Sequence, residues 1–193
     1  MIYQTDTAIG QLSLKPFDLA QDPSVIHQWT RQPYAEFWGL LGKSVAEVKD
    51  TYAELLTQPD MRIFIGYIDQ QPKFLLELYS PVHDAVADHY DVQAGDQGMH
   101  ILIAPANGKG NAISGFTFCI FEYIMSFIFS HDDIHRVVVE PDARNHKIHR
   151  INRMAGFEHE RIIDLGHKQA YLGFCTKAAF MRQKALRDAQ VKG

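Results

Sequence analysis

Cysteine is scarce in this chain, and an excess of positive charge is absent. Cys119 and Cys175 are the two cysteines among 193 residues, and they form no C-x-x-C spacing. The sequence therefore offers neither a zinc ribbon nor a dithiol redox motif, and its composition fits a reducing compartment, which predicts a cytoplasmic protein. The formal net charge of -4 argues against nucleic acid as a partner, because binding to a phosphate backbone needs a basic surface.

Long apolar segments without polar residues are also missing. The longest apolar run, residues 113–129, contains Thr117, Glu122 and Ser126, which favours a buried core helix over a membrane span. Residues 1–6 lack the basic and then apolar pattern of a secretory signal. No repeat, low-complexity tract or linker divides the chain. With 46% hydrophobic residues, we expect one domain over residues 1–193 and no membrane partner.

The elements that the residue pattern predicts have the order of an α/β protein. Apolar and β-branched runs predict strands, and apolar residues at helical spacing predict helices. Strands are expected at residues 2–9, 11–16, 62–69, 73–79, 98–104 and 136–140, helices at 22–31, 44–57, 113–129 and 145–154, and a closing hairpin at 157–175. Residues 80–97 read as loop, and the segment from Thr176 reads as a polar helix. A right-handed crossover should place strand 136–140 parallel to strand 98–104.

A glycine-rich turn between strand 98–104 and helix 113–129 is the most informative stretch. It consists of Asn107, Gly108, Lys109, Gly110, Asn111 and Ala112. Glycines let backbone N–H groups approach a ligand, and the first turn of the helix adds unpaired donors and partial positive charge. The turn therefore predicts a pyrophosphate-binding site, with an ordinary strand-to-helix turn as the structural alternative.

Two motifs resemble the GNAT acetyltransferase superfamily, which binds acyl-coenzyme A (acyl-CoA). Its pyrophosphate loop, Gln/Arg-x-x-Gly-x-Gly/Ala, is matched at Gly110 and Ala112, with Asn107 at the first position. Its coenzyme-contacting Asn at the start of a helix that ends in Gly-Phe is matched by Asn145 and the pair Gly156-Phe157. The resemblance implies a mixed central sheet with splayed parallel strands flanked by helices. It also implies acyl-CoA as co-substrate, contacted by Ile103, Asn107, Gly108, Lys109, Gly110, Asn111, Ala112 and Asn145.

Further blocks resemble the siderophore-biosynthesis branch of that superfamily, the aerobactin-, alcaligin- and putrebactin-type acyltransferases. They are His27-Gln28-Trp29, Phe37-Trp38-Gly39, Leu76-Glu77-Leu78-Tyr79, Asp96-Gln97-Gly98-Met99-His100 and Glu140-Pro141-Asp142-Ala143-Arg144-Asn145. The resemblance implies a small N-hydroxylated amine as acceptor, an N-hydroxy-diamine or N-hydroxylysine, and a hydroxamate product for iron chelation. Acetyl-CoA and succinyl-CoA are both open as donors.

Acyl transfer to an amine needs a group that accepts a proton and a support for the oxyanion. His100 in strand 98–104 is the predicted base, because imidazole titrates near neutrality and an apolar strand favours its neutral form. Asp142, after the neighbouring strand, is the second predicted catalytic residue. It can orient His100, accept a hydrogen bond from the hydroxylamine, or pair with a distal ammonium on the acceptor.

Four residues are candidates for binding the acceptor. Glu77 lies in an apolar strand, where an unpaired carboxylate is unfavourable, so it should meet a cation of the protein or the terminal ammonium of the substrate. Trp29, Trp38 and Tyr79 are expected either to line the acceptor channel or to be part of the core.

No metal site is predicted, although the chain has ten histidines. The pairs His131 and His135, and His146 and His149, have helical spacing, but no cysteine or carboxylate cluster completes a tetrahedral set. Neither cysteine lies beside a plausible base, so attack should be direct, in a ternary complex.

The sequence thus predicts an acyltransferase that moves an acetyl or succinyl group to an N-hydroxylated amine. Two alternatives stay open: an acetyltransferase for another small amine, such as a polyamine or antibiotic, and a non-catalytic module that binds acyl-CoA. Substitution of His100 distinguishes the non-catalytic module from the two enzymes, because only an enzyme would lose rate while it keeps coenzyme binding. The oligomeric state is not addressed by any of these patterns.

Overall fold

Packing contacts divide the chain into two units whose segments alternate along the sequence. The first unit comprises Met1–Leu78 and His100–Ile120, and the second comprises Tyr79–Met99 and Phe121–Gly193. The computed structural model describes residues 1–105 and 115–191. Because neither unit is one continuous segment, cutting the chain at a single point releases neither of them. The expectation of a single domain stays a prediction.

Four antiparallel strands begin the first unit. They are β1 (Tyr3–Thr7), β2 (Gly10–Pro16), β3 (Arg62–Ile68) and β4 (Gln71–Tyr79), and each pairs with the next. The β1–β2 turn requires glycine at position 10, because its φ is +116° and a Cβ there would lie 2.5 Å from Asp69 Oδ2. Both predicted hairpins are confirmed.

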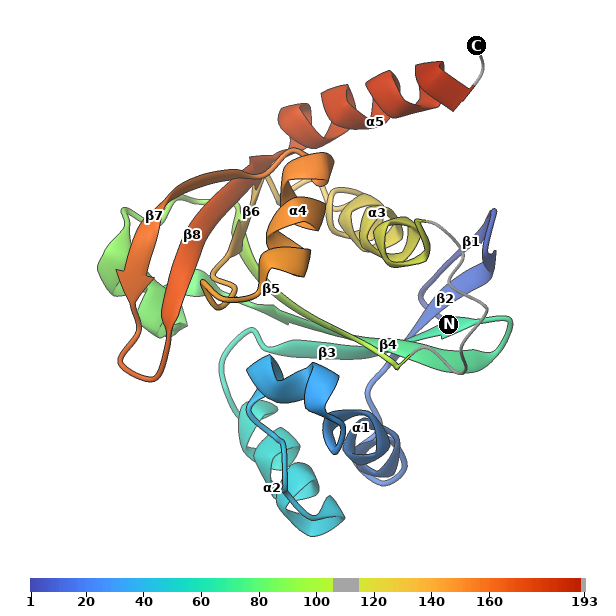
Figure 1. The fold of residues 1–193 in the computed structure, drawn as a ribbon, viewed down its shortest axis with the longest axis vertical. Coiled ribbons are helices and arrows are strands. Elements are labelled where there is room, and N and C mark those ends of the chain that lie inside the picture. The colour runs from blue at the N-terminus through green and yellow to red at the C-terminus, as the bar shows by residue number, and fades with distance from the viewer. Residues whose placement is uncertain (106–114, 192–193) are drawn as a thin grey trace. The chain divides into compact units, whose positions relative to one another are not determined.

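Helices α1 (Asp22–Thr30) and α2 (Val45–Leu55) lie on the same side of β3 and β4 in the first unit (Figure 1). A 3-10 helix, η1 (Pro33–Trp38), joins them. The spacing Ser44-x-x-Glu47 predicts a capping box at the start of α2, and the structure confirms it: Ser44 accepts from the Glu47 N–H while the Glu47 side chain accepts from the Ser44 N–H. The apolar face of these helices packs on the sheet, with Ile26, Val48 and Tyr52 of the helices and Ile65 and Leu75 of the strands buried in one core.

The second half of β5 (Asp96–Ile103) lies beside β4 in the first unit. The Ala104 N–H donates to the Lys73 carbonyl oxygen at 2.8 Å. Glu77 follows Lys73 by four residues on β4, and His100 precedes Ala104 by four residues on β5. Glu77 and His100 are also in contact. Together the two contacts define an antiparallel register in which Glu77 lies directly opposite His100.

The second unit contains the remaining strands, β6 (Arg136–Val139), β7 (Glu158–Asp164) and β8 (Gln169–Thr176). The first residues of β5 pair in parallel with β6, β6 pairs antiparallel with β8, and β7 and β8 form a hairpin. The predicted parallel placement of β6 beside β5 is therefore confirmed. Their ladder has three residue pairs, from Asp96 with Arg136 to Gly98 with Val138, as expected for parallel strands that splay apart.

The prediction that residues 80–97 form a loop is wrong. Two 3-10 helices lie within this segment, η2 (Pro81–His83) and η3 (Ala85–His89), and β5 begins at Asp96. Asp84 caps η3 by accepting from the Val86 N–H, and Val86 is fully buried. Proline and a capping aspartate define these short turns, so no helical periodicity of apolar residues marks them.

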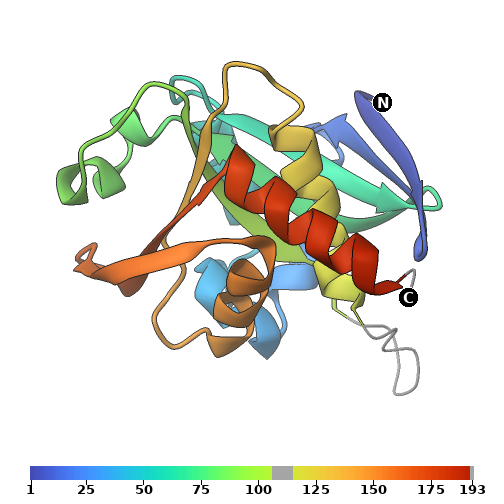
Figure 2. The same cartoon turned by 90° about the horizontal axis from the view of Figure 1, so that it is seen from above.

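Three helices complete the described chain: α3 (Phe116–Ile128), α4 (His146–Ala155) and α5 (Lys177–Val191). Helix α4 begins after its N-cap Asn145 and ends at Gly156, whose φ of 104° is left-handed, as the sequence predicts. Figure 2 shows α5 running across α3. Among the described helices, none combines the length and apolar character needed to cross a membrane.

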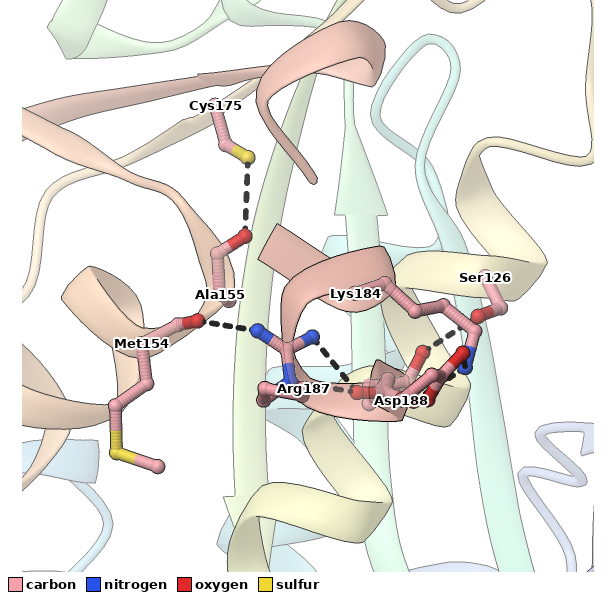
Figure 3. A network of polar contacts seen from close by, with 8 residues as sticks. Ser126, Met154, Ala155, Cys175, Lys184, Arg187 and Asp188 are labelled. Atoms are coloured by element: carbon pink, nitrogen blue, oxygen red, sulfur yellow. Dashed lines mark hydrogen bonds and ion pairs between the residues drawn. The ribbon is translucent and has the colours of Figure 1, made fainter. Parts of the chain in front are cut away.

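A network of charges holds α5 to the rest of the second unit (Figure 3). Glu122 of α3 accepts from Lys184 Nζ at 2.8 Å and from Arg187 Nη2 at 2.7 Å. Arg187 also donates to the Met154 carbonyl oxygen at the end of α4. Arg187 of α5 thereby connects α3 and α4.

Replacing Glu122 with Gln should lower the free energy of unfolding by about 1–3 kcal/mol, because two partly buried cations lose their shared anion. Urea unfolding followed by circular dichroism measures the change. The matched control is Asp188→Asn, whose carboxylate is 56% exposed and meets Lys184 at 3.5 Å. This control should change stability by less than about 0.5 kcal/mol. Equal effects of the two variants would contradict the assignment.

Candidate active site

Glu77 and His100 form a hydrogen-bonded pair in the first unit. His100 Nδ1 lies 3.2 Å from Glu77 Oε2. The Glu77 side chain is 7% exposed, whereas the His100 side chain is 34% exposed. The carboxylate is therefore enclosed by protein, and the imidazole is the member of the pair that solvent and substrate can reach.

Tyr52 and Trp38 extend this pair into a chain of four residues. The Tyr52 hydroxyl donates to Glu77 Oε1 at 3.0 Å, and Trp38 Nε1–H donates to the Tyr52 oxygen at 3.1 Å. The Trp38 ring also meets the His100 ring edge to face, with 6.4 Å between centroids. Helix α2 and the 3-10 helix η1 thus fix the carboxylate that β4 supplies, and Trp38 borders the imidazole.

The hydrogen bonds set the tautomer of His100. A carboxylate oxygen is an acceptor, so Glu77 Oε2 requires the proton of the neutral ring on Nδ1. The basic lone pair of that tautomer is then on Nε2. When the ring takes up a proton at Nε2, the Glu77 charge beside it stabilises the imidazolium. This arrangement gives His100 the electronic properties of a general base.

Tyr52 acts as a hydrogen-bond donor throughout the neutral pH range. Burial raises the pKa of Tyr52 well above its usual range, and the negative charge of Glu77 acts in the same direction. The phenol therefore keeps its proton. Its hydrogen bond to Glu77 leaves one carboxylate oxygen for Tyr52 and the other for His100.

Trp29 and Tyr79, two of the predicted acceptor-binding residues, are buried. Trp29 is 6% exposed within the core of the first unit. Tyr79, in the second unit, is 4% exposed, and its hydroxyl donates to Glu140 Oε2 at 2.7 Å. Lys168 lies 3.6 Å from the other Glu140 oxygen. These positions match the core alternative for both aromatic residues, whereas Trp38 is partly exposed beside His100.

Asp142 pairs with Arg144 in the second unit. Arg144 Nε and Nη2 donate to the two Asp142 oxygens at 2.9 and 2.8 Å, and the Arg144 N–H also donates to Oδ1. Hydrogen bonds from the Arg144 side chain lower the pKa of Asp142 to about 2, against the opposing effect of burial. Asp142 is therefore ionised at neutral pH, where it can accept hydrogen bonds and pair with a cation. Its catalytic role stays a prediction.

Stability should depend on this carboxylate in a defined pH window. Because folding lowers the pKa of Asp142, its contribution is complete above the unfolded value of 3.8 and is lost as pH falls through about 2. The Arg144 side chain is 77% exposed, so screening limits the contribution to about 1 kcal/mol. In urea unfolding, Asp142→Asn should be less stable than the parent by this amount at pH 7 and pH 5, and the difference should shrink below about pH 4. A difference that grows as pH falls would contradict this account.

Asn145 caps helix α4, with Oδ1 accepting from the Ile148 N–H at 3.4 Å. Asparagine is a preferred residue at this position of a helix, and the contact of Asn145 with the coenzyme stays a prediction. Ile103, the last residue of β5, is half-buried. The predicted pyrophosphate loop, Asn107, Gly108, Lys109, Gly110, Asn111 and Ala112, lies outside the described residues. The described chain does confirm that a strand leads into this loop and a helix follows it.

Burial raises the pKa of the Cys175 thiol to about 12. That cysteine is therefore protonated at neutral pH and unsuited to forming an acyl-enzyme. Within residues 1–105 and 115–191, no three His, Cys, Asp or Glu side chains are grouped so that they could hold a metal ion.

Sequence reasoning missed the partner of His100. Glu77 stood out as a charge in an apolar strand, but its contact with His100 depends on the register of β4 and β5. Tyr52 gave no signal of its own, because a tyrosine on the apolar face of a helix is an ordinary core residue. Only a prediction of the strand pairing that places residue 77 opposite residue 100 would have indicated the contact between Glu77 and His100.

The family model described as "Acetyltransferase (GNAT) domain" matches residues 18–165 of this chain. The chain belongs to this family, and it is an acyl-CoA-dependent N-acyltransferase.

Three curated relatives share most of its length. N-hydroxyputrescine acetyltransferase of Acinetobacter baumannii is 28% identical over 172 residues, which are 89% of this chain and 80% of that protein. N(6)-hydroxylysine O-acetyltransferase of Escherichia coli is 25% identical over 178 residues, 91% of this chain and 55% of that protein. N(5)-hydroxyornithine:cis-anhydromevalonyl coenzyme A-N(5)-transacylase of Beauveria bassiana is 22% identical, over 84% of this chain and 35% of that protein. The chain thus resembles siderophore-type acyltransferases, and it spans about half of the second relative and a third of the third.

Solved structures support the fold. An uncharacterized protein from Bacillus halodurans matches with a TM-score of 0.85 and 23% identity, over 94% of this chain and 93% of that one. The aminoglycoside acetyltransferase AAC(6')-Ib, solved in complex with coenzyme A, matches with a TM-score of 0.76 and 19% identity, over 90% and 99% of the two chains. The expected α/β class and GNAT fold are confirmed.

Proposed function

We propose that this enzyme transfers an acetyl group from acetyl-CoA to the hydroxylated nitrogen of an N-hydroxy-diamine, as a step in hydroxamate siderophore biosynthesis. The observation that carries the proposal is the pairing of His100 with Glu77, which provides a partly exposed base with a fixed tautomer. The acceptor class is supported by the three relatives, each of which is named for an N-hydroxylated amine.

His100 is the group that takes the proton from the acceptor. As the nitrogen lone pair forms the bond to the thioester carbonyl, Nε2 accepts the N–H proton, and Glu77 stabilises the resulting imidazolium. The carbon–sulfur bond then breaks, and the imidazolium proton is available to the departing thiolate. We infer direct transfer in a ternary complex, because neither cysteine is expected beside a base and Cys175 is held as a thiol.

An N-hydroxylated amine suits this base. Its nitrogen is less basic than that of a simple amine, so it is largely neutral in the cell and need not be deprotonated before attack. General-base assistance of about 100-fold or more is ordinary for a histidine. Positioning of the two substrates and backbone donors at the carbonyl oxygen should provide most of the remaining rate.

The other predicted site residues complete the proposal. We assign the coenzyme to Ile103, Asn145 and the predicted pyrophosphate loop, whose backbone N–H groups would hold the diphosphate. Trp38 beside His100 is assigned to the acceptor site. Asp142, ionised beside Arg144, stays the second predicted catalytic residue. Such a step belongs to iron acquisition and would take place in the cytoplasm.

The test is thiol release from acetyl-CoA and succinyl-CoA, each offered N-hydroxyputrescine, N-hydroxycadaverine, N-hydroxylysine and the parent amines. We expect the fastest release with acetyl-CoA and a hydroxylated diamine, with the product confirmed by mass. Fast turnover of parent amines alone would move the enzyme to a polyamine or antibiotic branch. Faster release from succinyl-CoA would overturn the assignment of the donor.

A further inference from the structure

The second unit contains an open pocket of about 580 Å³ that the proposed reaction does not use. It lies between α4 and the β7–β8 hairpin, which are neighbours in Figure 1. Its lining consists of His146, His149, Arg153, Phe157, Glu158, His159 and Tyr171. Four of these seven side chains carry or can gain positive charge, and Glu158 is the one carboxylate.

Three aromatic rings form the inner wall of this pocket, His149 buried and His159 and Tyr171 half-buried. The rings of His149 and His159 have centroids 5.3 Å apart, and both lie against the Tyr171 ring, at 4.8 and 5.6 Å. Gly173 of β8 leaves room for this arrangement, because a Cβ there would lie 2.8 Å from a carbon of the His159 ring. The strand sequence is therefore adapted to hold an imidazole at this place.

Buried His149 and half-buried His159 each have a nitrogen without a partner among the described residues. His149, only 4% exposed, points Nε2 at the Ala143 carbonyl oxygen, 3.3 Å away. A carbonyl oxygen only accepts, so the proton of the neutral ring is on Nε2 and the lone pair is on Nδ1. Nδ1 of His149 and Nε2 of His159 are the two unpartnered atoms. Each ring can therefore take up a proton without breaking an existing hydrogen bond.

The charges around the two rings oppose this protonation in the absence of an anion. Burial lowers the pKa of His149, hydrogen bonds with the Ala143 and Asp142 backbone oppose this, and the charges of His146 and Arg153 on the same helix act with burial. Burial also lowers the pKa of His159, as do His149 and Arg153. Of the groups that face the rings from β7 and β8, Glu158 alone favours a cation, while Tyr171 brings a neutral phenol.

We propose that the pocket between α4 and the β7–β8 hairpin binds a small oxyanion, a phosphate or carboxylate group, and that binding is coupled to proton uptake by His149 and His159. His146 and Arg153 are both exposed and are seven residues apart on α4, so they lie on the same face of the helix. Both would contact the anion directly. The protonated rings of His149 and His159 would add positive charge behind Arg153 and His146. A bound anion supplies the negative charge that the buried imidazolium needs, so anion and proton favour each other's binding.

The test uses the whole protein and sulfate, which stays divalent between pH 6 and pH 8. Isothermal titration calorimetry at constant ionic strength, in buffers of different ionisation enthalpy, measures both affinity and protons taken up. We expect tighter binding at pH 6 than at pH 8, by about tenfold for each proton and pH unit. Imidazole signals of His149 and His159 in NMR spectra should titrate at higher pH with sulfate than without it. Binding of sulfate without proton uptake, or no binding at either pH, would overturn the proposal.

Two arginines on the same helix give a matched pair of variants. Arg153→Gln should weaken sulfate binding at least about fivefold, whereas Arg150→Gln, exposed on α4 but outside the pocket, should leave it unchanged. Equal effects would show nonspecific attraction to a basic helix and would refute the site. Coenzyme A as competitor identifies the source of the oxyanion: displacement of sulfate assigns the pocket to a coenzyme phosphate, and undisturbed sulfate assigns it to a free anion. Because these measurements need no turnover, they are independent of the proposed reaction.

Discussion

Replacing His100 with Ala is expected to lower kcat with the hydroxylated acceptor by about 100- to 10,000-fold, the range that general-base catalysis supplies. The reason is geometric. His100 is the partly exposed end of a chain whose other members, Glu77, Tyr52 and Trp38, are fixed by hydrogen bonds between 3.0 and 3.2 Å. Without the imidazole, the proton of the attacking nitrogen must pass to water. Steady-state thiol release measures the loss.

Coenzyme binding and folding should survive this substitution. Truncation of this partly buried side chain leaves Glu77 without one partner and should lower stability, but Glu77 keeps its hydrogen bond from Tyr52, and titration calorimetry with coenzyme A should give an unchanged Kd. His131→Ala is the matched control, because that ring lies at the end of α3 against the carbonyl oxygens of Phe127 and Ile128. It should change kcat by less than about twofold. Unchanged rates in His100→Ala would remove the catalytic role.

Replacing Glu77 with Gln should have the second largest effect, a fall in kcat of about 10- to 100-fold with little change in KM for the acceptor. The amide keeps the size of the side chain but cannot stabilise an imidazolium, so the effect should appear in the chemical step. The acidic limb of the pH profile should move to lower pH, because protonated His100 loses its counter-charge. Glu54→Gln, on the exposed face of α2, is the control and should behave as the parent.

A double-mutant cycle distinguishes positioning from an independent role. If Glu77 acts through His100, the substitution Glu77→Gln should change the rate less than about twofold when His100 is already Ala. If Glu77 instead binds the terminal ammonium of the acceptor, as the sequence also allowed, its substitution should raise KM in both backgrounds. Tyr52→Phe removes one donor to Glu77 and should cause a smaller loss than Glu77→Gln.

Local patterns in the sequence predicted most of the elements. The capping box at Ser44, the left-handed Gly156 and the β-branched strand at residues 136–139 each follow from chemistry within a few residues. The short 3-10 helices between residues 81 and 89 were not predicted, because caps and a proline define them rather than a periodic pattern of apolar residues. Contacts between distant residues were harder to predict.

In the candidate site too, local features could be predicted from the sequence, whereas contacts between distant residues could not. His100 could be chosen from the sequence, since a histidine in an apolar strand needs an explanation. Its carboxylate partner could not, because Glu77 and Asp142 were both available and only the register of β4 and β5 separates them. Asp142 is instead bound to Arg144, two residues further along the chain. The pocket lined by His149 and His159 combines a helix with a hairpin, and no spacing within either element reveals it.

One competition experiment tests the central claim, that the hydroxylated nitrogen is the acceptor. Equal amounts of N-hydroxyputrescine and putrescine are offered together with limiting acetyl-CoA, and the products are separated by mass and tested for the coloured complex that hydroxamates form with ferric iron. The account predicts that the N-acetyl-N-hydroxy product dominates and binds iron. Acetylputrescine as the main product, or an acetylated hydroxyamine that does not bind iron, would contradict it.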